Sequence, residues 1–335
     1  MRHKPSRRHV LCGAVALAGG AAVGSVRREL PLPVPVQPSP VSILRQTAYD
    51  QTLYSTVRRA LDLHHLDVRG KHVVLKPNLV EFDPDRPINT HPLFVHAVLE
   101  GFRALGAASV RIAEGPGHRR ATLDMAEAAG YFDTIPGFES LFTDLNLDAV
   151  SLVHFARPHS KLTSLYLPQT VLGADLLVSL PKLKTHHWTG ATLSMKNLFG
   201  VVPGGIYGWP KNYLHWAGIP ECVADLTAHF PRTFALVDGI VGMEGNGPIQ
   251  GVAKAAGVLV AGRDLPSVDA TCCRIMGLDP QKIGYLQLSR ASHALTEDFN
   301  PQRGETLGSV QTHFAVLPQF EALRLTAKST VPIRT

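Results

Sequence analysis

The segment from Leu177 to Gly200 contains the residue types of this chain that are best suited to chemistry. It reads LVSLPKLKTHHWTGATLSMKNLFG, and three of the chain's eleven lysines lie in it. Its polar residues of interest are Lys182, Lys184, Thr185, His186, His187, Thr189, Lys196 and Asn197. Lysine binds phosphate and carboxylate, and histidine transfers protons near neutral pH. The segment therefore predicts a binding site for a small anionic ligand.

The polar residues follow an apolar strand and precede an expected helix. In an extended chain Lys182, Lys184 and His186 point to the same side. We expect the helix over residues 190–200 to begin after Thr189 as its N-cap, so that free N–H groups add to the anion site. The alternative is that these lysines are ordinary solvated surface charges.

The same pattern, an apolar strand followed by polar side chains, recurs along the chain. The polar residues that follow the other strands are Lys76, Asn78, Glu114, Asp238, Arg263 and Asp264. In parallel α/β sheets the carboxyl ends of the strands share one edge, and ligands bind there. We therefore expect these residues to converge on the lysine segment.

Roles can be assigned to the expected cluster from side-chain chemistry. The cofactor- or ligand-binding set is Lys76, Asn78, Lys182, Lys184, Thr185, Lys196 and Asn197. His186 is the expected general acid or base, with Glu114 and Asp238 orienting it or holding a cation.

Short apolar runs alternate with helical patterns from residue 41 onward. This order predicts an α/β fold with a mostly parallel sheet and helices on both faces. Residues 200–218, which read GVVPGGIYGWPKNYLHWAG, are expected to form a long loop inserted after the central helix.

The charge of the chain is concentrated at its start. The net charge is +6, but six basic residues and no acidic ones lie in the first 28 positions. The rest of the chain has 27 basic and 27 acidic residues. Because this body is neutral and has no basic patch with interleaved aromatic residues, nucleic acid is not an expected partner.

The first 28 residues resemble a twin-arginine export signal. Ser6, Arg7, Arg8 and Leu11 stand in the expected order before about fifteen small and apolar residues, which is short for a membrane span. An ordinary secretory signal or a short anchor is the alternative, and cleavage is left open. We expect export by the twin-arginine translocase to a periplasmic or extracytoplasmic location, with no stable membrane span beyond the signal. A proline-rich linker (residues 29–40) and a single α/β domain (residues 41–335) would follow.

The cysteines indicate no iron–sulfur cluster. Cys222, Cys272 and Cys273 form no C-x-x-C pair, and buried structural cysteine is the expected state. A metal ion remains an alternative, with His186, Glu114, Asp238 and Glu244 as its candidate ligands, although no known metal-ligand spacing is present.

Several segments resemble a family known as domain of unknown function 362. They are VVLKPNLV, THPLFVHAVLEGFRALGAASVRIAEGPG, LVSLPKLKTHHWTGATLSMKNLFG, ALVDGIVGMEGNGP and VLVAGRDLPSVDATCCRIMGLDP, in the family's order. Asp264 and Asp269 match acidic positions of the family. The family has no generally assigned reaction, so the resemblance indicates residues to test without giving their chemistry.

The leading functional hypothesis is an exported enzyme that binds an anionic small molecule or cofactor at the carboxyl edge of its sheet. A periplasmic binding or cofactor-carrier protein without turnover is the first alternative, and a metal-dependent redox protein is the second. Replacement of His186 distinguishes the first two, because it should abolish turnover and spare binding.

Overall fold

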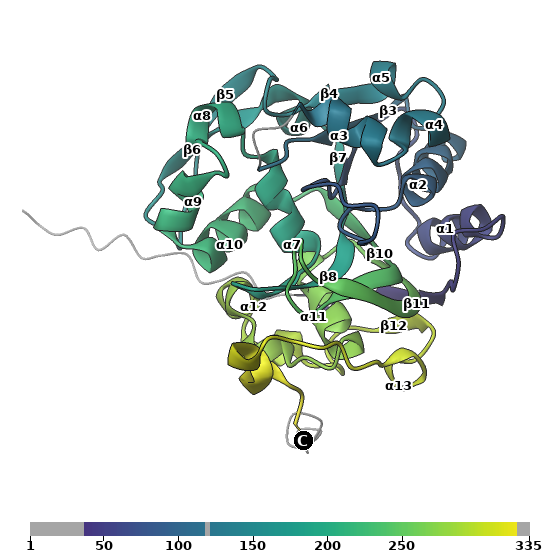
Figure 1. The fold of residues 1–335 in the computed structure, drawn as a ribbon, viewed down its shortest axis with the longest axis vertical. Helices are drawn as coiled ribbons and strands as arrows, with labels where there is room; N and C mark the ends of the chain where they lie inside the picture. The colour runs from purple at the N-terminus through teal and green to yellow at the C-terminus, as the bar shows by residue number, and fades with distance from the viewer. Residues whose placement is uncertain (1–36, 118–120, 327–335) are drawn as a thin grey trace, which may run out of the picture. The chain divides into compact units, whose positions relative to one another are not determined.

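The computed structural model describes residues 37–117 and 121–326, and Figure 1 shows the arrangement of their helices and strands. The strands are β1 (Val41–Arg45), β2 (His72–Pro77), β3 (Ser109–Glu114), β4 (Phe142–Asp144), β5 (Val150–His154), β6 (Ser164–Pro168), β7 (Leu176–Leu180), β8 (Lys182–His186), β9 (Gly190–Thr192), β10 (Thr233–Glu244), β11 (Val252–Gly262) and β12 (Gln302–Gly304). The α-helices are α1 (Leu53–Asp62), α2 (Pro92–Ala104), α3 (Thr122–Ala128), α4 (Tyr131–Thr134), α5 (Phe138–Leu141), α6 (Gln169–Leu172), α7 (Ser194–Asn197), α8 (Gly204–Tyr207), α9 (Asn212–Ala217), α10 (Ile219–His229), α11 (Leu265–Ile275), α12 (Gly284–Ser289) and α13 (Leu307–Val310). The 3-10 helices are η1 (Leu198–Val201), η2 (Pro280–Lys282), η3 (Ser292–Leu295) and η4 (Pro318–Leu323).

The main sheet is mixed and mostly parallel. Strands β10, β7, β2, β3 and β4 lie side by side in that order and all pair in parallel. Strand β11 pairs antiparallel with β10, β1 pairs antiparallel with β11, and β12 pairs in parallel with β1. Strands β5 and β6 form a separate antiparallel pair. The predicted α/β class with a mostly parallel sheet is therefore confirmed.

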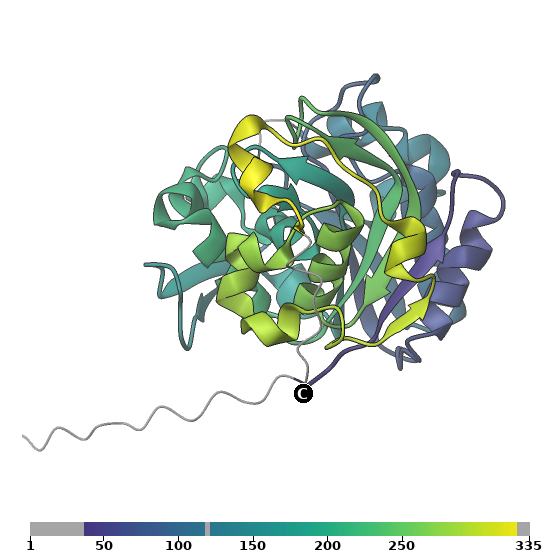
Figure 2. The same cartoon turned by 90° about the horizontal axis from the view of Figure 1, so that it is seen from below.

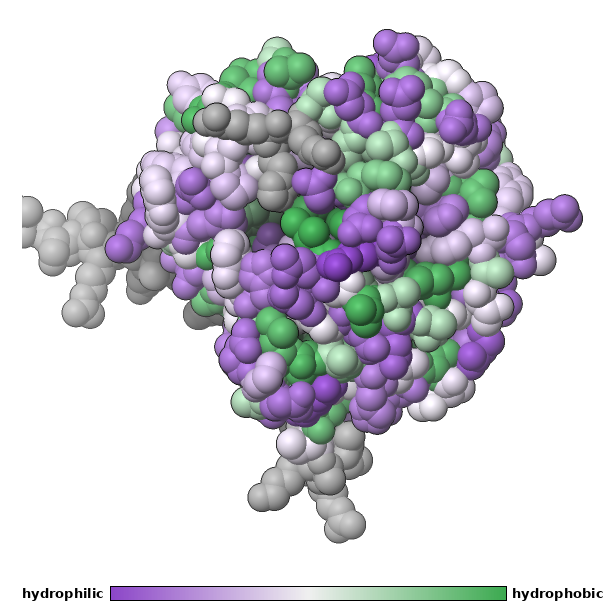
Figure 3. Space-filling model, viewed as in Figure 1, coloured by the Kyte–Doolittle hydropathy of each residue, from purple (hydrophilic) through white to green (hydrophobic). Residues whose placement is uncertain are grey.

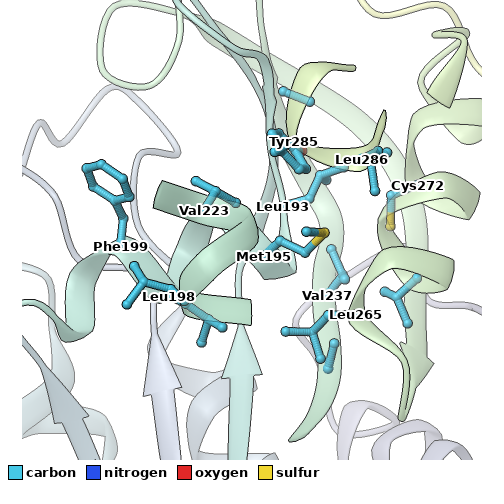
Figure 4. Close-up of a cluster of buried hydrophobic side chains, with 14 of the residues drawn as sticks. Leu193, Met195, Leu198, Phe199, Val223, Val237, Leu265, Cys272, Tyr285 and Leu286 are labelled. Carbon is cyan, nitrogen blue, oxygen red and sulfur yellow. The ribbon is translucent and has the colours of Figure 1, made fainter. Parts of the chain in front are cut away.

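Helices cover both faces of the sheet. Helices α1 and α2 pack on one face of the sheet, which is seen from below in Figure 2. Their apolar residues join a core cluster with β2, β3 and β7. Helices α7, α10 and α11 pack on the other face. Figure 4 shows this second core, in which Met195 of α7 lies between Val223 of α10 and Leu265 of α11. The apolar side chain of Met195 thus helps to hold the short α7 in place.

One predicted strand runs in the opposite direction to the others. We expected the strand before Arg263 and Asp264 to be parallel, but β11 is antiparallel to β10. Its carboxyl end therefore lies at the far edge of the sheet, away from the ends of β2 and β3. Asp264 is instead the N-cap of α11, where its carboxylate accepts a hydrogen bond from the Ser267 N–H at 3.0 Å.

The expected single α-helix over residues 190–200 is a short strand, a one-turn α-helix and a 3-10 helix in the structure. Residues Gly190–Thr192 form β9, which folds back antiparallel on β8 through a turn with Gly190 at φ +77°. The helix begins only at Ser194, so the prediction that Thr189 caps it was wrong. The expected long loop after it contains the short helices α8 and α9.

The backbone N–H groups at the start of α7 are bound by Asp269. This buried carboxylate of α11 accepts hydrogen bonds from the N–H of Ser194 at 2.8 Å and of Met195 at 3.0 Å, and also from the Ser194 hydroxyl. Burial raises the pKa of Asp269 to about 7, although these donors act in the opposite direction. Asp269 therefore fixes α7 to α11 and leaves no free helix N-terminus for an anion.

We predict that Asp269→Ala destabilises the protein by about 3 kcal/mol, because three donors lose their acceptor in a buried place. Urea denaturation followed by circular dichroism measures the change. The exposed Asp298→Ala is the control and should change the free energy of unfolding by less than about 0.5 kcal/mol. Equal effects of the two substitutions would show that Asp269 does not anchor α7.

Candidate functional site

A cavity of about 230 Å³ lies at the carboxyl ends of β2 and β3, beside β8 and α7. Figure 3, in the orientation of Figure 1, shows hydrophilic and apolar residues around a hollow near the middle of this face. The polar side chains that line the cavity are Lys76, Asn78, Glu114, Lys184, His186, His187, Trp188, Thr192, Lys196, Asn197, Lys211 and His215. Seven of the ten predicted site residues thus line one cavity, namely Lys76, Asn78, Glu114, Lys184, His186, Lys196 and Asn197.

A buried ion pair forms part of the cavity wall. Lys76 Nζ lies 2.6 Å from Glu114 Oε2, and both side chains are at most 1% exposed. The same carboxylate accepts hydrogen bonds from the N–H of Leu79 at 3.1 Å and of Gly115 at 2.9 Å. Burial lowers the pKa of Lys76, and Glu114 opposes that change. The charge of each partner is therefore already compensated by the other.

The side-chain amides of Asn197 and Asn78 lie beside this ion pair, and one of their two oxygen atoms has no hydrogen-bond partner. Asn197 donates from Nδ2 to Lys76 O at 3.0 Å and to Ser179 Oγ at 3.1 Å, so its Oδ1 faces Lys76 Nζ and Asn78 Nδ2. This orientation leaves Asn78 Oδ1 buried without a partner among the described residues. Thr192 Oγ1 is a second such atom, and both residues line the cavity.

Lys184 and Lys196 have no carboxylate partner among the described residues. Lys184 Nζ donates to two carbonyl oxygens, Ile88 O at 2.9 Å and Pro248 O at 3.3 Å. Burial lowers the pKa of Lys184 well below its usual value, and the nearby Lys182 and Lys196 lower it further. Burial, followed by the charge of Lys76, lowers the pKa of Lys196 to about 8. Both amines would regain their charge more easily beside a bound anion.

Lys211 is a further lysine of the cavity that sequence reasoning missed. Its Nζ donates to Gly115 O at 2.6 Å, Gly200 O at 3.0 Å and Phe199 O at 3.2 Å, which uses all three of its donors. Burial lowers its pKa to about 7. Lys211 ties the segment before α9 to the end of β3. Its signal in the sequence was the scarcity of lysine elsewhere, which we applied only to residues 177–200.

Two histidines of the cavity, His186 and His215, are held in their neutral form. Burial lowers the pKa of His186 well below its usual value, and burial lowers that of His215 to about 4. His186 Nδ1 accepts a hydrogen bond from the Trp188 N–H at 3.0 Å, so the neutral ring carries its proton on Nε2. Neither Glu114 nor Asp238 contacts this ring, so the prediction that they orient His186 was wrong.

Lys182 and Asp238 form a separate cluster. Lys182 Nζ lies 2.6 Å from Asp238 Oδ2 and 2.9 Å from the Tyr49 hydroxyl, which donates to Asp238 Oδ1 at 2.8 Å. Asp238 Oδ2 also accepts from the His91 N–H at 3.0 Å. Lys182 lines another hollow of about 410 Å³ with Tyr49 and His91. The expected convergence of Lys182 and Asp238 with Lys184 in one cavity is therefore wrong.

Thr185 and Glu244 also lie apart from the cavity cluster. The Thr185 hydroxyl donates to Gly245 O at 2.8 Å on the far side of β8 from Lys184. Among residues 37–117 and 121–326 no three His, Cys, Asp or Glu side chains gather as a metal site. Glu244 lies beside Lys254 at 3.4 Å, and Cys222, Cys272 and Cys273 are buried free thiols.

The predicted export signal lies outside the described residues, and the structure has no bearing on it. Within the part of the chain that is described, none of the helices is both long and apolar enough to span a bilayer.

This molecule is a mixed α/β protein with a lysine-lined cavity at the carboxyl edge of its parallel strands. The chain belongs to the family described as domain of unknown function (DUF362), whose model matches residues 73–274. It is 30% identical over 257 residues to the thylakoid-associated protein sll1697 of Synechocystis sp., which covers 72% of this chain and 76% of that relative. The residues matched by the family model include every residue that lines the cavity.

Two solved structures are similar to parts of the chain. The lactate racemase apoprotein from Thermoanaerobacterium thermosaccharolyticum is 16% identical with a TM-score of 0.40, over 65% of this chain and 54% of that one. A crystal structure of a Thermotoga maritima protein is 13% identical with a TM-score of 0.36, over 68% and 59%. The chain thus spans little more than half of either structure, and neither informs us about its ligand.

We predict that Lys76→Met costs about 3–5 kcal/mol of folding stability, because it leaves the Glu114 carboxylate buried and unpaired. The double variant Lys76→Met/Glu114→Gln should be more stable than the single one, since the stranded charge is removed. Chemical denaturation of the wild type and the three variants, with Glu114→Gln alone as the third, measures the coupling. Lys71→Met, in the exposed pair with Asp67, is the control and should change stability by about 0.5 kcal/mol or less. Strict additivity of the two cavity substitutions would contradict the pairing.

Proposed function

We propose that the cavity is the active site of an enzyme that acts on a small anionic molecule carrying a carboxylate or phosphate group. The observation that carries the proposal is the charge of the cavity lining. Its described residues include four lysines and one carboxylate, and that carboxylate is bound to Lys76. Lys184 and Lys196 are therefore left for a ligand.

The size and lining of the cavity fit a small ligand. A volume of about 230 Å³ is below the range of ~300–1,000 Å³ that is common for drug-sized ligands. Phe199, Trp188 and Pro210 supply apolar wall beside the lysines, and Asn78 Oδ1 and Thr192 Oγ1 supply unpaired polar atoms. A ligand with an anionic end and an adjacent hydrogen-bonding group could bind the lysines with the first and the unpaired polar atoms with the second.

Binding of an anion should be accompanied by proton uptake. The lysines of the cavity lose charge because burial lowers their pKa values, and a bound anion would restore it. The neutral His186 would present its Nε2–H as a hydrogen-bond donor and would accept a proton only if a nearby anion raised its pKa. We assign it the role of an acid after ligand binding.

We predict that sulfate raises the melting temperature of the protein more than chloride does at equal ionic strength. A ligand at a hundredfold excess over its Kd stabilises the folded state by about 2.7 kcal/mol. Lys184→Met should remove most of the sulfate effect, and Lys282→Met, outside the cavity, should retain it. Differential scanning calorimetry measures both. The full sulfate effect in both variants would overturn the anion-site proposal.

The sulfate effect should weaken as the pH rises through about 8. Lys196 has a pKa of about 8 when folded and ~10.4 when unfolded, so the unfolded chain holds more protons between these values. Without anion, the contribution of Lys196 to stability is therefore unfavourable below pH 8 and is relieved as the pH rises toward ~10.4. Sulfate stabilises the protonated amine and is bound less well when that amine loses its proton. A sulfate affinity that is constant from pH 7 to pH 9 would contradict this coupling.

We also propose that the protein is exported by the twin-arginine route, on the strength of Arg7 and Arg8 before the apolar stretch. The variant Arg7→Lys/Arg8→Lys should accumulate in the cytoplasm, and Arg27→Lys/Arg28→Lys, later in the same segment, should be exported normally. Cell fractionation and immunoblotting measure the distribution. Normal export of the wild type from a strain that lacks the twin-arginine translocase would contradict the proposal.

A further inference from the structure

We propose that Lys196 is a nucleophile that forms a Schiff base with the carbonyl carbon of a small 2-oxo acid, whose carboxylate is bound by Lys184. The inference rests on the proposed function and deepens it, because it names the class of substrate and the reacting amine. It rests on the different contacts that the amines of the four cavity lysines make.

Three of these lysines have donors already committed to the protein. Lys76 contacts the Glu114 carboxylate, Pro77 O at 3.1 Å and Asn197 Oδ1 at 3.2 Å. Lys211 donates to three carbonyl oxygens, and Lys184 donates to two. The amines of Lys76 and Lys211 are each surrounded by three hydrogen-bond acceptors, which leaves neither nitrogen a free direction from which to attack a ligand.

Lys196 is different. Its Nζ has no hydrogen-bond acceptor among the described residues and lies 4.1 Å from the centroid of the Phe199 ring. The ring holds the amine at the cavity wall without taking a hydrogen bond from it. Burial and the charge of Lys76 lower the pKa of Lys196 to about 8, so a large fraction of the amine is neutral at that pH. A desolvated lysine next to another cation is the usual form of a Schiff-base lysine.

Lys184 is suited to bind the carboxylate of the same molecule. Two of its three N–H donors are used by Ile88 O and Pro248 O, and the third is available to a ligand. Lys196 is among the charges that lower the pKa of Lys184, so the two amines act on each other electrostatically. A 2-oxo acid has its carbonyl carbon next to its carboxylate, which suits two amines that face one small cavity.

The unpaired atoms of Asn78 and Thr192 match the intermediate of this reaction. The neutral amine attacks the carbonyl carbon and forms a C–N bond, and the carbonyl oxygen becomes a hydroxyl by taking a proton from the nitrogen. This carbinolamine hydroxyl can donate to Asn78 Oδ1 and accept from the Thr192 hydroxyl. It then leaves as water with one further proton from the nitrogen, so that amine and carbonyl give imine and water with no oxidant or reductant.

The test is reductive trapping in the full-length protein. The protein is incubated at pH 8 with pyruvate and sodium cyanoborohydride, and the labelled lysines are mapped by peptide mass spectrometry. Because Lys161 is an exposed lysine outside the cavity, labelling of Lys196 should exceed that of Lys161 by more than about tenfold. Acetone, which has the carbonyl but no carboxylate, should label Lys196 more weakly than pyruvate.

Three variants separate the roles. Lys196→Arg keeps the charge but cannot form an imine, so it should lose the label and keep stabilisation by sulfate. Lys184→Met should reduce pyruvate labelling more than acetone labelling, and in Lys161→Met, outside the cavity, Lys196 should be labelled as in the wild type. Absence of label at Lys196 while sulfate still stabilises the protein would overturn the Schiff base and leave the anion site standing. Absence of both would overturn the proposed function itself.

Discussion

The buried ion pair between Lys76 and Glu114 is the interaction on which the cavity depends. It joins the ends of the neighbouring parallel strands β2 and β3. Lys76 also donates a hydrogen bond to Asn197, and Glu114 accepts hydrogen bonds from the N–H groups of Leu79 and Gly115. Because the pair neutralises the only carboxylate among the described cavity residues, the other lysines find no counter-ion in the protein. The cavity is therefore suited to anions because its one described carboxylate, Glu114, is already paired with Lys76. Replacing either residue alone would leave the other as a buried, unpaired charge with a large desolvation cost.

The sequence predicted the parts of the fold that follow from local pattern. Apolar runs such as VVL and LLVSL located the parallel strands, and the polar residues after them located the cavity edge. The direction of β11 was missed, although the connection from Glu244 to Val252 is shorter than the dozen or more residues that a parallel crossover needs. The β8–β9 turn was missed because the helical pattern of residues 190–200 competes with a left-handed Gly190, and tertiary packing decided between them.

The sequence predicted most of the residues that line the cavity, but not which side chains contact one another. Strand periodicity predicts that Lys182 and Lys184 share a side of the chain, but it gives no information on which residues each would contact there. Lys182 meets Asp238 and Tyr49, which belong to segments nearly 190 positions apart, and is neutralised. Lys184 meets only carbonyl oxygens and Lys196 meets an aromatic ring. Such differences arise from side-chain contacts between distant segments, which no local spacing encodes.

The backbone of Gly200 packs directly against this ion pair. A Cβ atom at that position would lie closer to Glu114 Oε1 and to Lys76 Nζ than van der Waals contact permits. A side chain at position 200 therefore requires the side chains of Lys76 and Glu114 to move, so we expect substitutions at positions 76, 114 and 200 to be epistatic. The end of the lysine segment and the ends of two earlier strands thus constrain one another's sequence.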